Sequence, residues 1–352
     1  MNQVTKIVIT GSPCDEKTAA LYHIQKTFSE KGYTVFLISE ITAEFIRSEI
    51  ASDNREKHFE ILRDLIKIQL EREQIYIKAA KNTNNKKILL IFDGGIMDNR
   101  AYMGDEEFEH ILSDLNENEV RIRDNYDAVF HWTAASDSHS SETDKKIISV
   151  WVGHPHLRII GNAGDPEIKI QQLTDEITAF IGDPEPIEIE RKYLIEYPDI
   201  TALERSPFCR RIEISQTYLS YPDGKYFRIR KRGCRGNNIY IKTFKQKISE
   251  LQRIEYEEII SQDEYDQYIN DPAAEKYTVE KFRYCLVYNS RYFELDVFPF
   301  WKDKALLEIE LTNENEHYEL PPYLHIIREV TFEDEYKNYS IAKKISESPA
   351  AE

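Results

Sequence analysis

Hydrophobic and polar positions change their pattern about halfway along the chain. In the first half, short runs of consecutive apolar residues alternate with longer segments in which apolar residues recur every three or four positions. The runs predict strands that are buried on both faces, and the longer segments predict amphipathic helices. This order favours a parallel sheet with helices on both of its faces. The predicted strands span residues 6–10, 34–38, 87–92, 127–132 and 157–160, and the predicted helices span residues 17–31, 57–80 and 166–180.

A break follows at residues 182–186, which read Gly-Asp-Pro-Glu-Pro and cannot continue a regular helix. Beyond it, short stretches of alternating apolar and polar residues are separated by turn signals such as Tyr-Pro-Asp-Gly at residues 221–224. Such alternation is typical of antiparallel strands that pack one face on a core. We expect two helices among these strands, over residues 263–269 and 334–345.

The length of the chain agrees with a division at this break. A chain of 352 residues exceeds the roughly 250–300 residues at which a single hydrophobic core stops growing. The sequence therefore predicts an α/β domain with a parallel sheet over residues 1–183. An α+β domain with an antiparallel sheet is predicted over residues 184–347, followed by a polar tail over residues 348–352.

Several strands of the second half carry two like charges on either side of one apolar residue. Because alternate residues of a strand share a face, about 6–7 Å apart, the apolar residue packs on a core while both charges face the other way. A solvent face would be expected to mix the two signs within a strand. Separate acidic and basic strands favour a surface that holds a polyanion together with divalent cations, which prefer carboxylate oxygens. The pairs are Glu188/Glu190, Arg228/Arg230, Glu255/Glu257, Lys281/Arg283, Glu294/Asp296 and Glu308/Glu310.

Basic residues are concentrated in residues 225–253, although the formal net charge of the whole chain is −17. The segment carries ten Lys and Arg residues against one acid, Glu250. A linear triphosphate offers the matching negative charge, because Arg binds phosphate oxygens in pairs and Lys binds them as a point charge. The acidic balance of the whole chain argues against a nucleic-acid partner and against a general membrane-surface protein.

The remaining composition suggests a cytoplasmic protein in a reducing compartment. No apolar run approaches the length of a transmembrane segment, and the apolar residues 7–9 precede no cleavage-site pattern. The cysteines show neither the spacing of a metal site nor that of a redox motif. They are Cys14, Cys209, Cys234 and Cys285.

A phosphate-binding loop is predicted at residues 11–18, between the first strand and the first helix. Gly11, Lys17 and Thr18 match the pattern G-x-x-x-x-G-K-[ST], but Glu16 replaces its second glycine. Two unit charges about 4 Å apart interact by roughly 4 kcal/mol at an effective dielectric constant near 20, so Glu16 would cancel most of the attraction that Lys17 offers to a phosphate. A scaffold without nucleotide chemistry is the alternative interpretation.

The first half resembles the small P-loop kinase-like domain, related to nicotinamide riboside kinases, of the TRPL translocation defect protein family. The resemblance rests on the phosphate loop and on residues 93–98, 133–135 and 151–155. It implies that Asp93 acts on magnesium and Asp98 on a substrate.

Two further departures from that family accompany Glu16. Gly94 stands where the family carries an arginine, and residues 135–147 are short for its lid. We therefore expect no kinase activity, while GTP or ATP binding stays open. His154 and His156 flank a proline in an apolar context, so we expect them to be structural rather than metal ligands.

The second half resembles a CYTH domain, the group of triphosphate tunnel metalloenzymes that includes thiamine triphosphatase and the class IV adenylate cyclases. The same order of two domains occurs in the TRPL translocation defect family. The matching blocks are Glu188/Glu190/Lys192, residues 216–219, Arg228/Arg230, Thr243/Lys245, Arg253/Glu255/Glu257, Lys281/Arg283, Glu294/Asp296, Glu308/Glu310 and residues 329–331.

This resemblance implies an antiparallel barrel whose charged side chains line a tunnel. The implied ligands of Mg²⁺ or Mn²⁺ are Glu188, Glu190, Glu308 and Glu310, with help from Asp296. The implied phosphate-binding residues are Arg228, Arg230, Lys245, Lys281 and Arg283. Lys192, together with Glu190, Arg228 and Arg230, is expected to act on the reacting phosphoryl group, and Glu255 and Glu257 would orient the basic residues.

Three functions are compatible with these residues. The first is metal-dependent hydrolysis of inorganic triphosphate, a nucleoside triphosphate or a compound like thiamine triphosphate, with the first domain as a regulatory or nucleotide-binding module. The second is a non-enzymatic adaptor that binds GTP and phosphoinositides. The third is an adenylate cyclase, which would use the same charged tunnel.

Overall fold

The computed structural model describes residues 3–39, 55–133, 138–161, 165–182, 187–247 and 252–347. The chain forms two compact units, Met1–Glu176 and Ile177–Glu352. The sequence predicts a domain boundary between residues 183 and 184, and this exact position stays a prediction. Among the described residues, no helix has both the length and the apolar character needed to cross a membrane.

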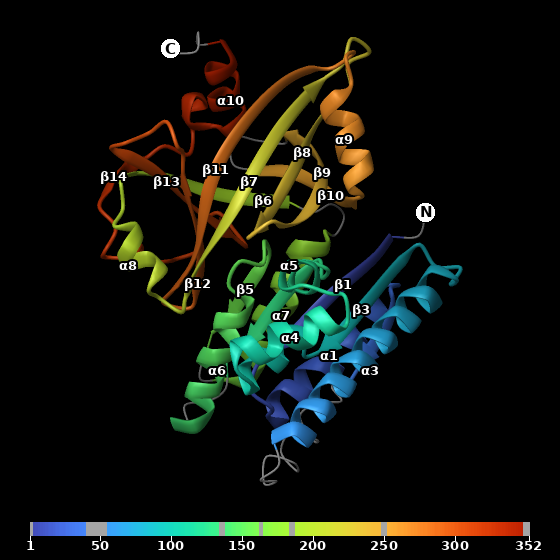
Figure 1. Ribbon diagram of the computed structural model, residues 1–352. Coiled ribbons are helices and arrows are strands. Elements are labelled where there is room, and N and C mark those ends of the chain that lie inside the picture. Colours follow the sequence, from blue (N-terminus) through green and yellow to red (C-terminus); the bar gives the residue numbers. More distant parts are fainter. Residues whose placement is uncertain are drawn as a thin grey trace. The chain divides into compact units, whose positions relative to one another are not determined.

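The first unit is built on a parallel sheet of five strands in the order β2-β3-β1-β4-β5, of which Figure 1 labels β1, β3 and β5. Nearly continuous apolar runs produce these strands, because helices cover both faces of the sheet and most side chains of β3 and β4 are buried. All five lie where the hydrophobic pattern predicts them. They are β1 (Gln3–Thr10), β2 (Thr34–Ile38), β3 (Lys87–Asp93), β4 (Ala128–Trp132) and β5 (Leu157–Ile160).

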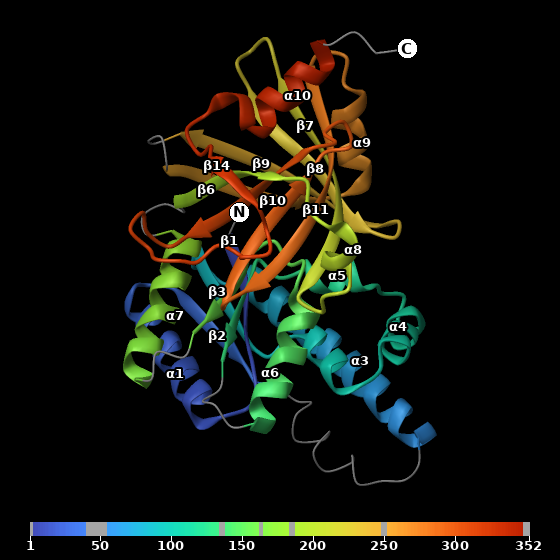
Figure 2. The ribbon, with the colours of Figure 1, turned by 90° about the vertical axis from the view of Figure 1, so that its left-hand side faces the viewer.

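Helices cover both faces of this sheet. Figure 2 shows α1 and α7 on one side of the strands and α3 and α6 on the other. The three long predicted helices correspond to α1, α3 and α7, whereas the sequence pattern did not predict α4, α5, α6 or the 3₁₀ helix η1. The bounds are α1 (Asp15–Glu30), α3 (Arg55–Lys81), η1 (Ile96–Tyr102), α4 (Asp105–Asp114), α5 (Glu119–Arg123), α6 (Ser138–Trp151) and α7 (Pro166–Ile181).

The second unit is an antiparallel barrel. Strands follow the order β10-β9-β8-β7-β11-β12-β13-β6, and a further pairing of β10 with β6 closes the ring. β14 pairs with a later part of β6, on the edge that does not contact β13. The strands are β6 (Ile187–Glu196), β7 (Cys209–Ser220), β8 (Tyr226–Cys234), β9 (Asn237–Lys247), β10 (Gln252–Ile260), β11 (Glu275–Tyr288), β12 (Arg291–Val297), β13 (Lys304–Leu311) and β14 (Ile326–Glu329).

Four short helical segments accompany the barrel. The helix expected over residues 263–269 is present as α9, and the one expected over residues 334–345 is divided by Lys337 into a 3₁₀ turn and a helix. The segments are α8 (Ile200–Glu204), α9 (Gln262–Asn270), η2 (Asp334–Tyr336) and α10 (Asn338–Glu347).

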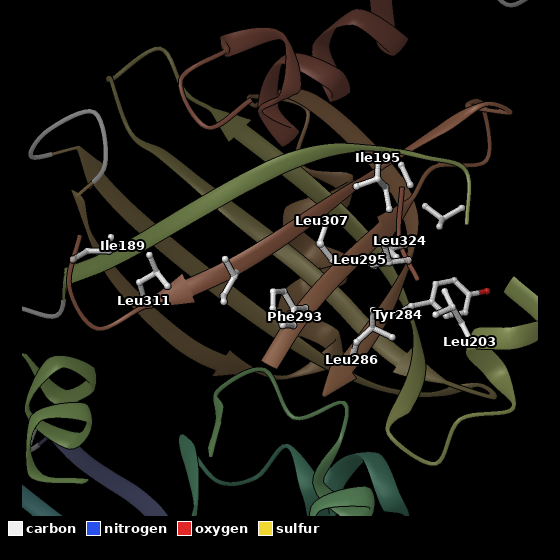
Figure 3. Close-up of a cluster of buried hydrophobic side chains, with 13 residues drawn as sticks. Ile189, Ile195, Leu203, Tyr284, Leu286, Phe293, Leu295, Leu307, Leu311 and Leu324 are labelled. Atoms are coloured by element: carbon white, nitrogen blue, oxygen red, sulfur yellow. The ribbon is translucent and has the colours of Figure 1, made fainter. Parts of the chain in front are cut away.

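Alternation along the barrel strands separates an apolar outer face from a largely charged inner face. On the outside, Ile195, Leu295 and Leu307 pack in one buried cluster with Leu203 of α8 (Figure 3). A second outer cluster joins strand residues such as Ile229 to α9. The neighbouring positions along each strand must then point inward, because successive side chains of a strand alternate between its two faces. This arrangement confirms the expected apolar exterior beneath the helices.

One end of the barrel interior departs from the charged pattern. Leu194, Val279, Phe298 and Leu306 lie on the inward face and form a buried cluster with Ile341 of α10. α10 therefore packs apolar residues into this end of the barrel. The charged inward positions lie beyond this cluster along the same strands.

Candidate active site

The inner face of the barrel brings acidic and basic strands into register. Glu310 of β13 is directly opposite Glu190 of β6, and Glu308 is opposite Lys192. On its other side, β13 places Glu308 opposite Glu294 of β12. Four carboxylates and one ammonium group, separated widely in sequence, thus come from three neighbouring strands. We call this group the acidic wall; it comprises Glu190, Glu294, Glu308 and Glu310, with Lys192 among them.

Lys192 and Glu308 form a buried ion pair at the centre of the acidic wall. Lys192 Nζ lies 2.7 Å from Glu308 Oε1. Burial alone would lower the pKa of Lys192, but the carboxylates of Glu308 and Glu190 outweigh it and raise that pKa above its ordinary value. Burial would likewise raise the pKa of Glu308, and Lys192 and Arg283 instead hold it well below its usual range. Both groups are therefore charged at neutral pH.

Two basic residues of β11, Lys281 and Arg283, face the acidic wall. Arg283 Nε and Nη2 each lie 2.7 Å from an oxygen of Asp296, in a two-pronged contact, and Nη2 lies 3.2 Å from Glu308 Oε2. Arg283 also contacts Glu294, and Lys281 contacts Asp296. Both oxygens of Asp296 therefore bind basic side chains in this structure.

Lys281 links the barrel interior to α10. Its Nζ donates a hydrogen bond to Asn338 Oδ1 at 3.0 Å. Burial lowers the pKa of Lys281 to about 8, against the opposing effect of Asp296 and with a further lowering by Arg283. This buried ammonium is therefore neutralised more easily than that of an exposed lysine.

The opposite side of the interior is basic. Arg228 Nη2 donates to Thr243 Oγ1 at 3.2 Å and to Glu257 Oε1 at 3.1 Å, and the Thr243 hydroxyl donates to the same Glu257 oxygen at 2.9 Å. Glu257 thereby orients Arg228, as expected from the sequence. Arg230 and Arg232 follow on the same face of β8, and all three arginines are buried.

Most of the residues expected at the site do lie on one inward surface. These are Glu190, Lys192, Arg228, Arg230, Lys281, Arg283, Asp296, Glu308 and Glu310. The side chains of Glu188, Lys245 and Glu255 lie outside the residues whose side chains the structure describes, so their predicted roles stay predictions.

Two residues of the interior were not predicted. Arg232 continues the alternation of Arg228 and Arg230 by one step, and that periodicity could have identified it. Asn338 has no such signal, because its contact with Lys281 depends on how α10 folds back onto the barrel.

The carboxylates of the acidic wall have the chemistry of a divalent cation site. Glu190 and Glu310 are like charges in directly opposed positions, which is unfavourable in a sheet unless positive charge lies near them. Lys192 supplies such charge beside Glu190, and a divalent cation would add to it. Oxygen ligands of this kind suit Mg²⁺ and Mn²⁺. Within the described side chains, which exclude Glu188, no three acidic, His or Cys groups already converge as a metal site. The residues present therefore fit a divalent cation by charge and donor type.

The phosphate loop of the first unit is folded around Gly11 and Lys17. Gly11 has a φ of +129°, and a Cβ there would lie 2.2 Å from the carbonyl oxygen of Trp132, so glycine is required. Lys17 is buried; its Nζ donates to Gly11 O at 3.1 Å and lies 3.0 Å from Asp93 Oδ1. The hydroxyl of Thr18 donates a hydrogen bond to the backbone carbonyl oxygen of Cys14 at 3.4 Å.

Asp98 and His154 are held by structural contacts in the same unit. Asp98 accepts hydrogen bonds from Thr10 Oγ1 at 2.7 Å and from Trp151 Nε1 at 2.5 Å, so it ties β1 to α6. Its predicted action on a substrate stays a prediction. His154 Nε2 lies 2.9 Å from Tyr126 O, and Nδ1 accepts from His156 N at 3.0 Å, as expected for a structural histidine.

Comparison with known protein families finds a matching domain family for each unit. Residues 6–165 match the family model of an AAA domain, and residues 186–319 match that of a CYTH domain. No match was found among the curated proteins.

Three solved structures are similar to part of the chain. The hypothetical protein NE1496 is 30% identical, over 44% of this chain and 97% of that chain, with a TM-score of 0.30. A structure described as the inorganic triphosphatase NE1496 is 29% identical, over 44% and 93%, with a TM-score of 0.29. HpAC1 from Hippeastrum, described as a putative adenylyl cyclase with a dominant triphosphatase activity, is 17% identical, over 36% and 80%, with a TM-score of 0.25.

The matched residues coincide with the two units described above, since one match covers the parallel sheet and the other covers most of the barrel. The chain thus joins an AAA domain in its first half to a CYTH domain in its second half.

Proposed function

We propose that the chain is a divalent-cation-dependent hydrolase of triphosphate compounds and that the barrel interior is its active site. The observation that carries the proposal is the register of β6 and β13, which sets Glu190 opposite Glu310 while Lys192, Lys281 and Arg283 lie on the same inward surface. Buried carboxylates beside buried cations suit a ligand that is itself a polyanion with bound metal ions. The CYTH match supports the same conclusion.

The substrate class follows from the charge and shape of the interior. Basic side chains come from three strands, β6, β8 and β11, and lie on the inward face of the barrel. Positive charge distributed in this way would suit a linear chain of phosphates, as in inorganic triphosphate, a nucleoside triphosphate or a thiamine triphosphate-like compound. The arginines contribute paired N–H donors, and the lysines contribute point charges.

In hydrolysis, water attacks the terminal phosphorus, and the bond from this phosphorus to the bridging oxygen breaks. The two products are orthophosphate and the corresponding diphosphate. Negative charge spreads over the phosphate oxygens in the transition state, and fixed cations stabilise it more than they stabilise the substrate. Arg228, Arg230, Lys281 and Arg283 would bind these oxygens. Lys192 would bind the terminal phosphate or its attacking water.

The acidic residues would serve in two ways. Glu190, Glu308 and Glu310, together with Glu188, would hold Mg²⁺ or Mn²⁺, which polarises a phosphoryl group and favours deprotonation of water. Asp296 would instead orient Lys281 and Arg283, since both of its oxygens contact them. Glu257 would hold Arg228 in the same manner.

The first unit would act as a regulatory or nucleotide-binding module. Its phosphate loop keeps the glycine, lysine and threonine of the motif, and Lys17 is placed beside Asp93. No phosphoryl transfer is assigned to this unit, because Glu16 stands where the motif requires a glycine.

A test is the release of phosphate by the full-length chain from inorganic triphosphate, ATP, GTP and thiamine triphosphate, with Mg²⁺, with Mn²⁺ and with a chelator. The proposal predicts metal-dependent release that Lys192→Ala and Glu310→Ala abolish. Lys302→Ala and Glu335→Ala are matched controls, because both side chains are exposed and lie away from the inward surface.

The products decide between the proposal and its rivals. Orthophosphate with a diphosphate product supports hydrolysis, whereas a cyclic nucleotide with pyrophosphate would assign a cyclase. Binding of a triphosphate or an inositol phosphate headgroup without metal-dependent turnover would assign a non-enzymatic adaptor. Phosphate release that is unchanged in both interior variants would exclude this site.

A further inference from the structure

The phosphate loop of the AAA domain already binds a negatively charged group that belongs to the chain itself. The backbone N–H of Ser12, inside the loop, donates to Asp144 Oδ1 at 2.9 Å. Asp144 lies on α6 and its relative exposure is 6%. Backbone N–H groups of a phosphate loop are the donors that bind phosphate oxygens. The Asp144 carboxylate therefore occupies one backbone donor of the loop.

Two buried lysines surround the same loop. Lys17 is held by the carbonyl oxygen of Gly11 and by Asp93, as described above. Lys169 of α7 has a relative exposure of 2%; it contacts the carbonyl oxygen of Thr133, and its Nζ lies 4.0 Å from the ring centre of Trp132. A loop flanked by two buried ammonium groups has the charge of a site for an anionic ligand.

Electrostatics connect Lys169 to the unusual residue of the loop. Burial lowers the pKa of Lys169, while the nearby Glu16, Cys14 and Asp144 raise it. Glu16 therefore has a basic neighbour other than Lys17, and the expected cancellation of the charge of Lys17 by Glu16 is reduced. Asp144 is then the acid that competes most directly with a phosphate, because it is bound to the loop backbone.

A buried histidine beside Asp144 provides an independent observation. His131, at the end of β4, has a relative exposure of 0%, and neither of its ring nitrogens has a hydrogen-bond partner among the described residues. Its Nε2 lies 3.9 Å from Asp144 Oδ1, too far for a hydrogen bond. Burial lowers the pKa of His131 to about 4, with Asp144 opposing and Lys17 and Lys169 adding to the effect. A neutral imidazole thus faces this side of the loop with an unused N–H donor.

We propose that Asp144 is an internal competitor that limits the affinity of the phosphate loop for phosphate esters such as nucleotides. A ligand phosphate replaces the Asp144 carboxylate on the N–H of Ser12, and Lys17, Lys169 and His131 then face that phosphate. The competition is electrostatic, because a carboxylate and a phosphate oxygen repel each other at the same donor. This inference concerns the first unit and is independent of the proposed hydrolysis in the barrel.

The test is calorimetric binding of the β,γ-imido analogues of ATP and GTP, with Mg²⁺, to the full-length chain. These analogues avoid turnover of the terminal phosphate. Asp144→Asn removes the charge and keeps the shape of the side chain, and Asp144→Ala removes the competing group. We expect at least tenfold tighter binding at the phosphate loop for one of the analogues in Asp144→Asn, and tighter binding again in Asp144→Ala.

Two further variants make the result specific. Glu142→Gln removes an acid from the exposed surface of the same helix and should leave the affinity unchanged. Lys17→Ala combined with Asp144→Asn should lose the gain, while any binding in the barrel is the same in all variants. An affinity of Asp144→Asn within twofold of the unmodified chain, with an unchanged circular dichroism spectrum, would overturn the proposal. A gain that survives Lys17→Ala would overturn it as well.

Discussion

Glu190 of β6 and Glu310 of β13 are directly opposite each other in an antiparallel pair of strands. Side chains in such positions have Cβ atoms about 4.5–5.5 Å apart, so two carboxylates there repel each other. Their strands are closed into a barrel, and neither side chain can move to the outer face without shifting the register by one residue. The fold therefore keeps the two carboxylates close together, and a divalent cation is a ligand that would bind both of them.

Replacing Glu310 by Gln should remove the contribution of metal binding to stability. With a chelator present, we expect the free energy of unfolding to change by at most about 1 kcal/mol, because the repulsion from Glu190 and the favourable contacts of Glu310 are lost together. With Mn²⁺ present, the stabilisation that the unmodified chain gains from the cation should disappear. Denaturant unfolding with and without Mn²⁺ measures both effects. Equal stabilisation of both proteins by Mn²⁺ would place the cation elsewhere.

Replacing Lys192 by Met should destabilise the barrel, because it removes the nearest cation from the buried carboxylate of Glu308. The expected loss is about 3 kcal/mol, the lower end for a broken buried pair, since Arg283 Nη2 remains 3.2 Å from Glu308. The pKa of Glu308 is depressed in the folded chain, so its stabilising effect is present above its ordinary pKa of 4.5 and is lost as the pH falls. The difference between the two proteins in denaturant unfolding should therefore narrow below pH 4.5, and a constant difference would contradict this account.

A third prediction concerns Glu73 of α3, which is buried and accepts a hydrogen bond from the hydroxyl of Tyr126 at 2.8 Å. Burial raises its pKa to about 7, against the lowering effects of Tyr126 and Lys6. The folded chain thus favours the protonated acid, and stability should fall as the pH rises from 4.5 to 7, by up to about 1.4 kcal/mol per pH unit.

In Glu73→Gln, the free energy of unfolding should not show the fall between pH 4.5 and pH 7 that the titration of Glu73 causes. Glu71→Gln, an exposed acid two residues away, serves as the control and should retain it. If the pH dependence of Glu73→Gln matches that of the unmodified chain, the buried carboxyl is not the titrating group.

The phosphate loop gives a fourth prediction, about Gly11. An alanine there would have a positive φ and a Cβ 2.2 Å from the carbonyl oxygen of Trp132. We expect a loss of at least about 1–3 kcal/mol, the usual cost of a residue held in an unfavourable backbone conformation. Gly104→Ala is the matched control, since no atom lies within 4 Å of the added carbon. Comparable thermal unfolding of the two variants would contradict the requirement for glycine at position 11.

The strands and their faces could be predicted because their signals are local. The apolar runs at β1, β3 and β4 and the alternation at β6, β8 and β13 depend only on which residues follow one another. Charge pairs such as Glu308 and Glu310 were therefore assigned to one face correctly. The apolar end of the barrel was not predicted, although Leu194 and Leu306 continue the same alternation from charged residues.

Contacts between distant segments could not be predicted in the same way. Asn338 meets Lys281 only because α10 packs into the end of the barrel, and Asp144 reaches Ser12 only because α6 lies beside the phosphate loop. α6 itself was missed, since its sequence carries many polar residues and its apolar positions lie near one end. The ion-pair partners of individual side chains could not be predicted either. The sequence suggested Asp296 as a metal ligand, whereas its oxygens bind Lys281 and Arg283 in the structure.

The proposed hydrolysis requires a divalent cation and a triphosphate to bind together inside the barrel. Anomalous diffraction at the manganese edge tests this requirement, with crystals of the full-length chain grown with Mn²⁺ and a non-hydrolysable triphosphate. We expect an anomalous peak beside Glu190 and Glu310, with phosphate density against Arg283 and Arg228. Manganese bound only outside the barrel, or phosphate density absent from its interior while the triphosphate binds elsewhere, would contradict it.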